Sequence, residues 1–171
     1  MSANDTATVT VRDATPEDAV AACHVLRESI SRLCVADHHN DPAILNAWLA
    51  SKTPAMVAAW ATQKGNSLLL AVEGDAILAV GSVTDAGEIT LNYVSPDARF
   101  RGVSRALLKA LEARAMARGN KRCKLTSSET AHRFYQSAGY RNDGAPRGKF
   151  GARSSYPMSK QIVAAKFAPD Q

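Results

Sequence analysis

The spacing of apolar and polar residues changes along the chain and predicts both strands and helices. β-Branched residues alternate with polar ones over 7–13, which predicts a first strand. Apolar residues then recur at helical spacing over 20–35, behind a Thr-Pro-Glu-Asp start sequence at 15–18. We expect the apolar stripe of this first helix to face the core.

Two shorter helices are predicted next, each marked by a proline that follows a capping residue. Asp41-Pro42 precedes an apolar stripe over 44–49, and Thr53-Pro54 precedes a second one over 56–60. The polar residues 37–40 separate these helices from the first one and are predicted to form a loop.

From residue 67 onward the period is that of strands. Two apolar runs meet at Gly74-Asp75, which predicts a hairpin, and a turn at 85–87 leads into a third strand that ends before Pro96. The order of elements predicts a mixed sheet covered by helices, an α/β (α+β) arrangement. The elements expected after Pro96 are a helix over 99–118, a strand over 123–126, a helix over 128–137, a loop over 144–151 and a last strand over 154–163.

Composition narrows the class of protein. The 171 residues are 46% hydrophobic and 22% charged, which predicts a single domain, residues 1–171, with a full core and excludes disorder of the whole chain. No apolar run approaches the ~20 residues that span a bilayer, and the start lacks the order of a signal peptide. The three cysteines form no CxxC pair, which fits a reducing compartment. We therefore expect a cytoplasmic protein without membrane contact.

Charge is distributed unevenly. Residues 1–98 hold 5 Lys and Arg against 12 Asp and Glu, whereas 99–171 hold 16 against 4. Such asymmetry indicates one region that meets an anion and another that tolerates a cation. One face of the predicted helix over 99–118 is basic, and basic residues continue after it. This basic face is either a solvated surface or a patch that binds phosphate or nucleic acid. Few aromatic residues lie among its basic residues, which disfavours stacking of nucleic-acid bases. The residues of this face are Lys109, Arg114, Arg118, Lys121 and Arg122.

The segment that follows Pro96 has the composition of a phosphate-binding turn. The N–H groups at a helix start are unpaired and carry positive potential, and Gly102 lets the backbone approach a ligand closely. Arg99, Arg101 and Arg105 add cations that bind phosphate in a forked geometry. The turn is neither a P-loop nor a dinucleotide fingerprint, since GK[ST] and GxGxxG are both absent.

This turn resembles the acetyl-CoA motif [QR]xxGx[GA] of the GNAT acetyltransferases. Arg99, Gly102 and Ser104 occupy the marked positions, with Ser in place of Gly or Ala at the last. A second segment about thirty residues later, SSETAHRFYQSAGY, resembles the family's NxxAxxFYxxxGF. Its matched residues are Ala131, Phe134, Tyr135 and Gly139, with Ser128 in place of Asn and Tyr140 in place of Phe. The resemblance covers about 67–162, while 1–66 matches only in element order.

The resemblance implies the GNAT fold, with a mixed, mostly antiparallel sheet of six to seven strands flanked by helices. It also implies acetyl-CoA as cosubstrate, no metal, and a pantetheine arm lying between the fourth and fifth strands, where a backbone N–H near Val94 would polarise the thioester carbonyl. The residues implied to bind acetyl-CoA are Asn92, Tyr93, Val94, Arg99, Phe100, Arg101, Gly102, Val103, Ser104, Arg105, Ser128 and Tyr135.

Amine acetylation needs a group that takes a proton from the amine and a group that protonates the leaving thiolate. By the resemblance, Tyr135 is the general acid. Glu88 stands where some of the family's histone acetyltransferases carry a glutamate base, and a water chain is the alternative. His38 and His39 are expected to border the acceptor, because the loop between the first helices often does so in this fold. Cys34-x3-His-His is not a zinc-finger spacing, so no metal is expected.

The sequence thus predicts a GNAT-like N-acetyltransferase that passes acetyl directly to a primary amine of an unidentified small molecule or peptide. A homodimer is compatible with the resemblance. One alternative is a non-catalytic module of the same fold that binds CoA or a partner protein. The other is a small basic nucleic-acid-binding domain, which steep salt dependence of oligonucleotide binding without CoA binding would favour.

Overall fold

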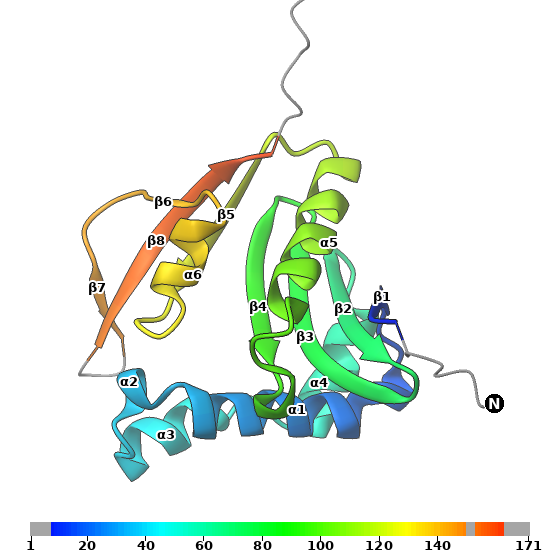
Figure 1. Ribbon diagram of the computed structural model, residues 1–171, viewed down its shortest axis with the longest axis horizontal. Coiled ribbons are helices and arrows are strands. Elements are labelled where there is room, and N and C mark those ends of the chain that lie inside the picture. The colour runs from blue at the N-terminus through cyan, green and yellow to red at the C-terminus, as the bar shows by residue number, and fades with distance from the viewer. Residues whose placement is uncertain (1–7, 150–152, 163–171) are drawn as a thin grey trace, which may run out of the picture.

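One sheet that splits into two diverging parts organises the structure, a computed structural model that describes residues 8–149 and 153–162 (Figure 1). Its strands are β1 (Thr10–Asp13), β2 (Asn66–Glu73), β3 (Ala76–Thr84), β4 (Glu88–Val94), β5 (Arg122–Ser127), β6 (Arg141–Asn142), β7 (Arg147–Lys149) and β8 (Arg153–Gln161). The helices are α1 (Ala19–Leu33), α2 (Val35–His38), α3 (Pro42–Leu49), α4 (Pro54–Thr62), α5 (Val103–Ala117) and α6 (His132–Ser137), with 3-10 turns η1 (Pro16–Asp18) and η2 (Pro96–Ala98).

The strand order is β1-β2-β3-β4-β5-β8-β6, and β7 pairs with β8. Every pair is antiparallel except β4 with β5. The chain reaches β5 through α5, the crossover helix that a parallel connection requires. The predicted mixed, mostly antiparallel sheet is confirmed, with eight strands among the described residues instead of six or seven.

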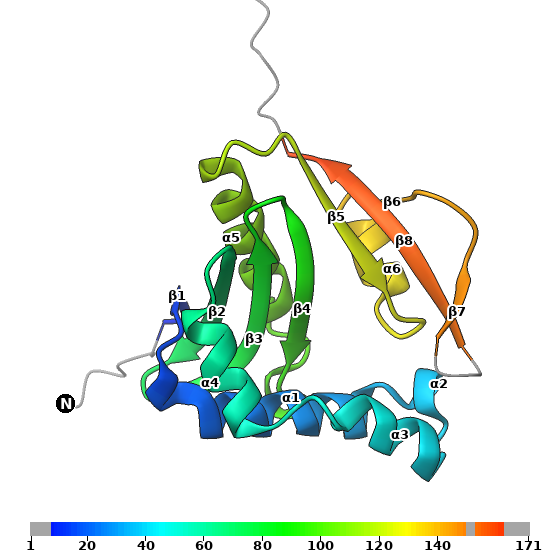
Figure 2. The same cartoon turned by 180° about the vertical axis from the view of Figure 1, so that it is seen from behind.

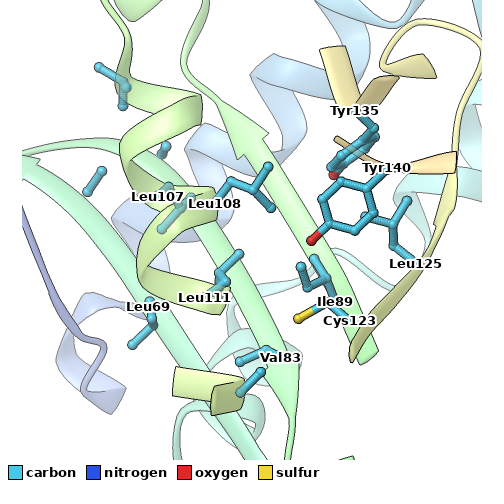
Figure 3. Packing of buried hydrophobic residues seen from close by; sticks show 14 of the residues in the cluster. Leu69, Val83, Ile89, Leu107, Leu108, Leu111, Cys123, Leu125, Tyr135 and Tyr140 are labelled. Atoms are coloured by element: carbon cyan, nitrogen blue, oxygen red, sulfur yellow. The ribbon is translucent and has the colours of Figure 1, made fainter. Parts of the chain in front are cut away.

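Helices cover both faces of the sheet, so β2 and β3 are buried on either side (Figures 1 and 2). Leu69 and Val83 pack with Leu107 and Leu111 of α5 on one face (Figure 3). On the other face, side chains of α1 and α4 pack against alternate residues of the same strands, such as Leu70. This alternation explains why the strands read as continuous apolar runs.

A glycine on β3 allows α5 to lie close to the sheet. A Cβ built on Gly81 would stand 2.9 Å from Cδ1 of Leu111 and 3.0 Å from Cδ2 of Leu107. Both leucines are fully buried, so the space is filled by α5 itself. The position of α5 fixes where its N-terminus meets the end of β4.

The two oppositely charged parts of the chain pair with one another in the fold. Arg114 of α5 binds both carboxylate oxygens of Asp13 at 2.9 Å and lowers the pKa of that carboxyl through these hydrogen bonds. Arg101 pairs with Glu73, and Arg118 lies 3.7 Å from Asp85. Two residues of the basic face, Arg114 and Arg118, therefore pair with acids from the first half of the chain.

Four predicted boundaries are wrong, each for a local reason. Residues 37–40 were expected to form a loop, but α2 occupies Val35–His38 because Asp37 and His38 find buried backbone partners. The helix expected from residue 99 begins at Val103, and the one expected from 128 begins at His132. The expected loop 144–151 contains β7, which the partner strand β8 induces; residues 150–151 lie outside the described residues.

No helix in the described part of the chain has the length and apolar character to cross a membrane.

Candidate active site

The parallel strands β4 and β5 pair over only two positions and then separate (Figure 2). The pairs are Glu88 with Lys124 and Ile89 with Leu125. A cavity of about 640 Å³ lies where the strands diverge, a volume suited to a small-molecule ligand. Side chains of β4, β5, α6, the start of α5 and the segment from α1 to α3 line it. The V between β4 and β5 is thus the candidate binding site.

β4 carries a bulge beside this cavity. Ser82 pairs with Leu91 and Val83 pairs with Ile89, so Thr90 is the extra residue. Beyond the bulge, Val94 packs toward the α5 side of the sheet and Tyr93 toward the α1 side. Asn92 shares the cavity with both.

The start of α5 forms one end of the cavity. Gly102 has φ +75°, a left-handed conformation that favours glycine, and a Cβ built there would meet nothing within 4 Å. The first intrahelical hydrogen bond runs from Ala106 N–H to Gly102 C=O at 3.0 Å. The N–H groups before Ala106 in the first turn therefore have no partner within the helix. Arg99 and Arg105 line the cavity beside this turn. The arrangement is an open, positive cradle for an anion.

Phe100 and Arg101 differ from their neighbours in this turn. Phe100 also has a left-handed backbone (φ +62°), is 92% exposed, and lies 4.6 Å from the Arg99 guanidinium. It lines the rim of the cavity. Arg101 is absent from the described lining and pairs with Glu73 instead.

Tyr135, the predicted general acid, has its side chain in the lining of the V. It projects from α6, is 6% exposed, and its ring lies edge-on to Tyr140 at 5.6 Å (Figure 3). Burial raises the pKa of Tyr135 to about 12, and a hydrogen bond from the Asn92 side chain opposes this rise. The phenol therefore keeps its proton at neutral pH.

The Asn92 amide is only partly used by the protein. Its side chain bonds Tyr135, yet its Oδ1 is buried without a hydrogen-bond partner. An unpaired buried carbonyl costs free energy unless a ligand donor reaches it. Asn92 lines the cavity, so this oxygen marks a place for an N–H or O–H group of a ligand.

Asp37 ties α2 to the loop that precedes α6. Its carboxylate accepts from Glu129 N–H at 2.8 Å, from Thr130 N–H at 3.1 Å and from the Thr130 hydroxyl. The residue is 5% exposed and lines the cavity. Its bonds join the segment from α1 to α3 to the β5–α6 side of the V.

We expect Asp37→Ala to lower the free energy of unfolding by about 3 kcal/mol, because it leaves buried N–H groups without their charged acceptor. In thermal unfolding this corresponds to a Tm lower by roughly 6–12 °C. Asp41→Ala removes an exposed carboxylate that only caps α3, and serves as the control with an expected loss of about 1 kcal/mol. Equal Tm values for the two variants would contradict the proposed tie.

Neither buried thiol near the site is set up as a nucleophile. Cys34 lines the cavity, but burial, with the adjacent Asp37 carboxylate, raises its pKa to about 12. Cys123 belongs to the α5-side core, and burial raises its pKa to about 11. Both remain thiols at neutral pH, which disfavours acyl transfer through a cysteine.

The structure brings most of the sequence-predicted site residues together but not all of them. The predicted residues that line the cavity are Asn92, Tyr93, Val94, Arg99, Phe100, Gly102, Val103, Ser104, Arg105, Ser128 and Tyr135. Glu88 lies at the closed end of the V with an exposed side chain and is not among the described lining residues.

The two histidines also lie outside the described lining. His38 is fully buried; its Nε2 lies 3.0 Å from Ile30 C=O, and its Nδ1 accepts from Asn40 N–H at 3.0 Å. Both ring nitrogens therefore serve the local fold, and the expected role in acceptor binding is not supported. His39 follows in a left-handed conformation at the exposed end of α2.

Sequence reasoning missed the part of the cavity wall that α1 and α3 supply. Ile44 and Trp48 stand four residues apart on α3 and line the cavity half-buried. The sequence did contain a signal for this wall: a tryptophan lies on an eight-residue helix rich in apolar residues, and so short a helix can bury only part of its apolar surface in the core. Across residues 8–149 and 153–162, no group of three or more His, Cys, Asp and Glu could hold a metal ion.

The comparisons with known proteins agree with this geometry. The family model of the acetyltransferase (GNAT) domain matches residues 24–162. A GCN5-related N-acetyltransferase from Rhodopseudomonas palustris superposes with a TM-score of 0.79 and 26% identity, over 94% of this chain and 99% of that one. No curated protein matches the sequence significantly.

Two more distant structures share the fold. PaiA N-acetyltransferase from Thermoplasma acidophilum, solved with coenzyme A, has a TM-score of 0.76 and 16% identity, over 90% of this chain and 99% of that one. The ribosomal-protein-S18-alanine N-acetyltransferase from Escherichia coli has a TM-score of 0.63 and 19% identity, over 94% and 99%. The matched family model, which spans most of the chain, establishes that this protein belongs to the GNAT acetyltransferase family.

Proposed function

We propose that the protein transfers the acetyl group of acetyl-CoA directly to a primary amine. The observation that carries the proposal is the buried Tyr135 hydroxyl beside Asn92, inside a cavity whose one end is the open N-terminus of α5. A phosphate cradle and a neutral acid in one cavity are what amine acetylation from a CoA thioester requires.

Acetyl-CoA fits the residues present. The open face of Gly102 leaves room for a pyrophosphate against the first turn of α5, with Arg99 and Arg105 as its counter-charges. The unpaired Asn92 Oδ1 would accept from an amide N–H of the pantetheine arm. Ser128 lines the same wall, although its hydroxyl already accepts from Ala131 N–H at 3.3 Å. The coenzyme A present in the PaiA structure supports the same assignment.

Acetyl-CoA supplies an activated acyl group on a thiol leaving group. Tyr135 holds the proton that this thiol needs, and Asn92 fixes the direction of its hydroxyl. The backbone N–H near Val94 is proposed to polarise the acyl carbonyl, as an oxyanion hole does. The closed apolar walls at Ile89 and Leu125 strengthen these interactions by excluding water.

The amine proton has no obvious acceptor among the described lining residues. Asp37 is the carboxylate there, and three donors already bind it. We therefore propose that the ammonium form of the acceptor loses a proton to water at the mouth of the cavity and that the free amine attacks. The proton that the new amide nitrogen then releases replaces the one that Tyr135 gives to the thiolate. The ratio kcat/KM then rises with pH as the amine deprotonates.

The non-catalytic alternative differs at Tyr135, because a module that only binds CoA has no use for a buried phenol that opens into the cavity. The ion pairs of the basic face weaken the nucleic-acid alternative, because they neutralise part of its charge. Arg114 and Arg118 pair with Asp13 and Asp85, and Arg122 binds Asp143 at 2.8 Å. No specific observation favours either alternative.

Calorimetric titration with acetyl-CoA, followed by a thiol-release assay with amines, tests the proposal. We expect micromolar binding and thiol release that depends on the amine. Binding without thiol release for any amine would leave only the CoA-binding module. An absence of binding at millimolar acetyl-CoA would reject the cofactor assignment itself.

A further inference from the structure

The wide end of the V is closed by the segment from α1 to α3, which runs across it in both views (Figures 1 and 2). α1 packs on one side of the sheet and α5, whose start forms the phosphate cradle, packs on the other, so an acceptor that approaches the acyl group from the α1 side meets this segment. The described wall at this end is mainly apolar. The apolar and aromatic lining residues at this end are Leu33, Ile44, Ala47, Trp48 and Tyr93.

The charges of the cavity wall do not suit an acceptor with several cations. The charged described residues in the lining are Asp37, Lys52, Arg99 and Arg105. Asp37 is the one carboxylate among them, and its oxygens are bound to Glu129 and Thr130. A second ammonium group on the acceptor would lose its hydration in a site whose described lining carries three cations and one carboxylate, which is costly when the site is partly buried.

Trp48 is the largest side chain of this wall. Its indole N–H donates to the Tyr93 hydroxyl, and burial keeps Tyr93 neutral by raising its pKa. The two rings therefore hold each other at the acceptor end with their polar atoms paired. What they offer a ligand is an apolar, aromatic surface, with Ile44 one helical turn away on α3.

We propose that the acceptor is a primary amine on an apolar, preferably aromatic, body with no second cationic group, and that Trp48 determines this specificity. The inference rests on the proposed acetyl transfer and names the substrate class for it. It excludes polyamines and polycationic aminosugars as preferred acceptors.

Three probe amines separate shape from charge: 2-phenylethylamine, n-butylamine and 1,4-diaminobutane. At equal free-amine concentration we expect kcat/KM for 2-phenylethylamine to exceed that for 1,4-diaminobutane at least tenfold, with n-butylamine between them. A value for 1,4-diaminobutane equal to or above that for 2-phenylethylamine would overturn the proposal and leave acetyl transfer intact.

Substitutions on α3 test the residue assigned. Trp48→Ala should raise KM for 2-phenylethylamine at least tenfold with kcat and acetyl-CoA affinity unchanged, and Trp48→Phe should restore most of the loss. Ile44→Glu adds a carboxylate to the same wall and should shift the preference toward 1,4-diaminobutane, a gain that misfolding cannot produce. Met56→Ala, on an exposed α4 position outside the described lining, is the control. Unchanged amine preference in both Trp48→Ala and Ile44→Glu would overturn the assignment.

A binding measurement tests the proposed acceptor site independently of acetyl transfer. The chain has two tryptophans, so Trp60→Phe leaves Trp48 as the only indole reporter. In the presence of CoA, 2-phenylethylamine should change its fluorescence at concentrations at least tenfold lower than 1,4-diaminobutane. That result without thiol release from acetyl-CoA would support the acceptor site and reject the transferase proposal. The absence of any change with 2-phenylethylamine would reject the acceptor site.

Discussion

Gly102→Glu should weaken acetyl-CoA binding at least ~100-fold, because a like charge placed against a phosphate costs several kcal/mol. The glycine has φ +75°, and an added side chain would extend into the open space above the first turn of α5. Backbone strain contributes as well, since any other residue adopts this conformation at a cost of about 1 kcal/mol. Calorimetric titration with acetyl-CoA measures the loss.

Two variants separate charge from strain. Gly102→Ala has the same backbone cost and no charge, so its affinity should fall far less than that of Gly102→Glu. Gly65→Glu makes the same change at φ +78°, also with open space around the Cβ, in the turn before β2 and outside the described lining. It should leave affinity unchanged. Wild-type affinity in Gly102→Glu would remove the start of α5 from the cofactor site.

Tyr135→Phe should lower kcat about 10²-fold or more while acetyl-CoA affinity stays within a factor of two or so, because the ring is kept and only the proton donor is removed. Tyr140→Phe is the matched control. Its ring lies 5.6 Å from that of Tyr135, but its hydroxyl donates to Glu112 at 3.3 Å in the core, outside the described lining. That variant should lose some stability and keep its kcat. Full activity in Tyr135→Phe would exclude it as the acid.

The pH dependence follows from the same tyrosine. Burial raises its pKa to about 12, so the phenol stays almost fully protonated from pH 7 to 10 and is half deprotonated only near pH 12. The kcat/KM profile should therefore rise with amine deprotonation and show no falling limb between pH 7 and 10. A tyrosine with the ordinary pKa near 10 would begin to lose activity at the upper end of this range. A fall that starts near pH 9 would contradict the assigned proton state.

Local sequence signals predicted the helices and strands well where neighbouring residues alone determine where an element begins or ends. The proline-led starts at Pro42 and Pro54, the turn at Gly74-Asp75 and the stop at Gly139 all lie at element ends in the structure. The helix expected from residue 99 begins only at Val103, because the positive φ of Phe100 and Gly102 keeps residues 99–102 outside the helix. β7 escaped prediction because only pairing with β8 makes it a strand.

The cofactor side of the site was predictable because its residues lie in two short segments with a recognisable pattern. The acceptor side was not, because it depends on contacts between distant segments. Asp37 reaches the loop at Glu129 and Thr130 more than ninety residues away, and no local pattern encodes that bond. His38 was misjudged for the same reason, since burial against Ile30 removes it from solvent.

The arginines from residue 99 onward show that charges counted in the sequence can be paired in the folded protein. Their number predicted an exposed basic face, but three of them pair with carboxylates from the first half of the chain. Arg99 and Arg105 stay beside the cavity, where an anion is needed.

Mass spectrometry of both product and protein during turnover tests the central claim most directly. With acetyl-CoA and 2-phenylethylamine, the account predicts N-acetylated amine in equal molar amount to the CoA released, and protein whose mass never increases by an acetyl group. CoA release without acetylated amine, or an acetylated protein that forms and decays with turnover, would contradict direct transfer within this cavity.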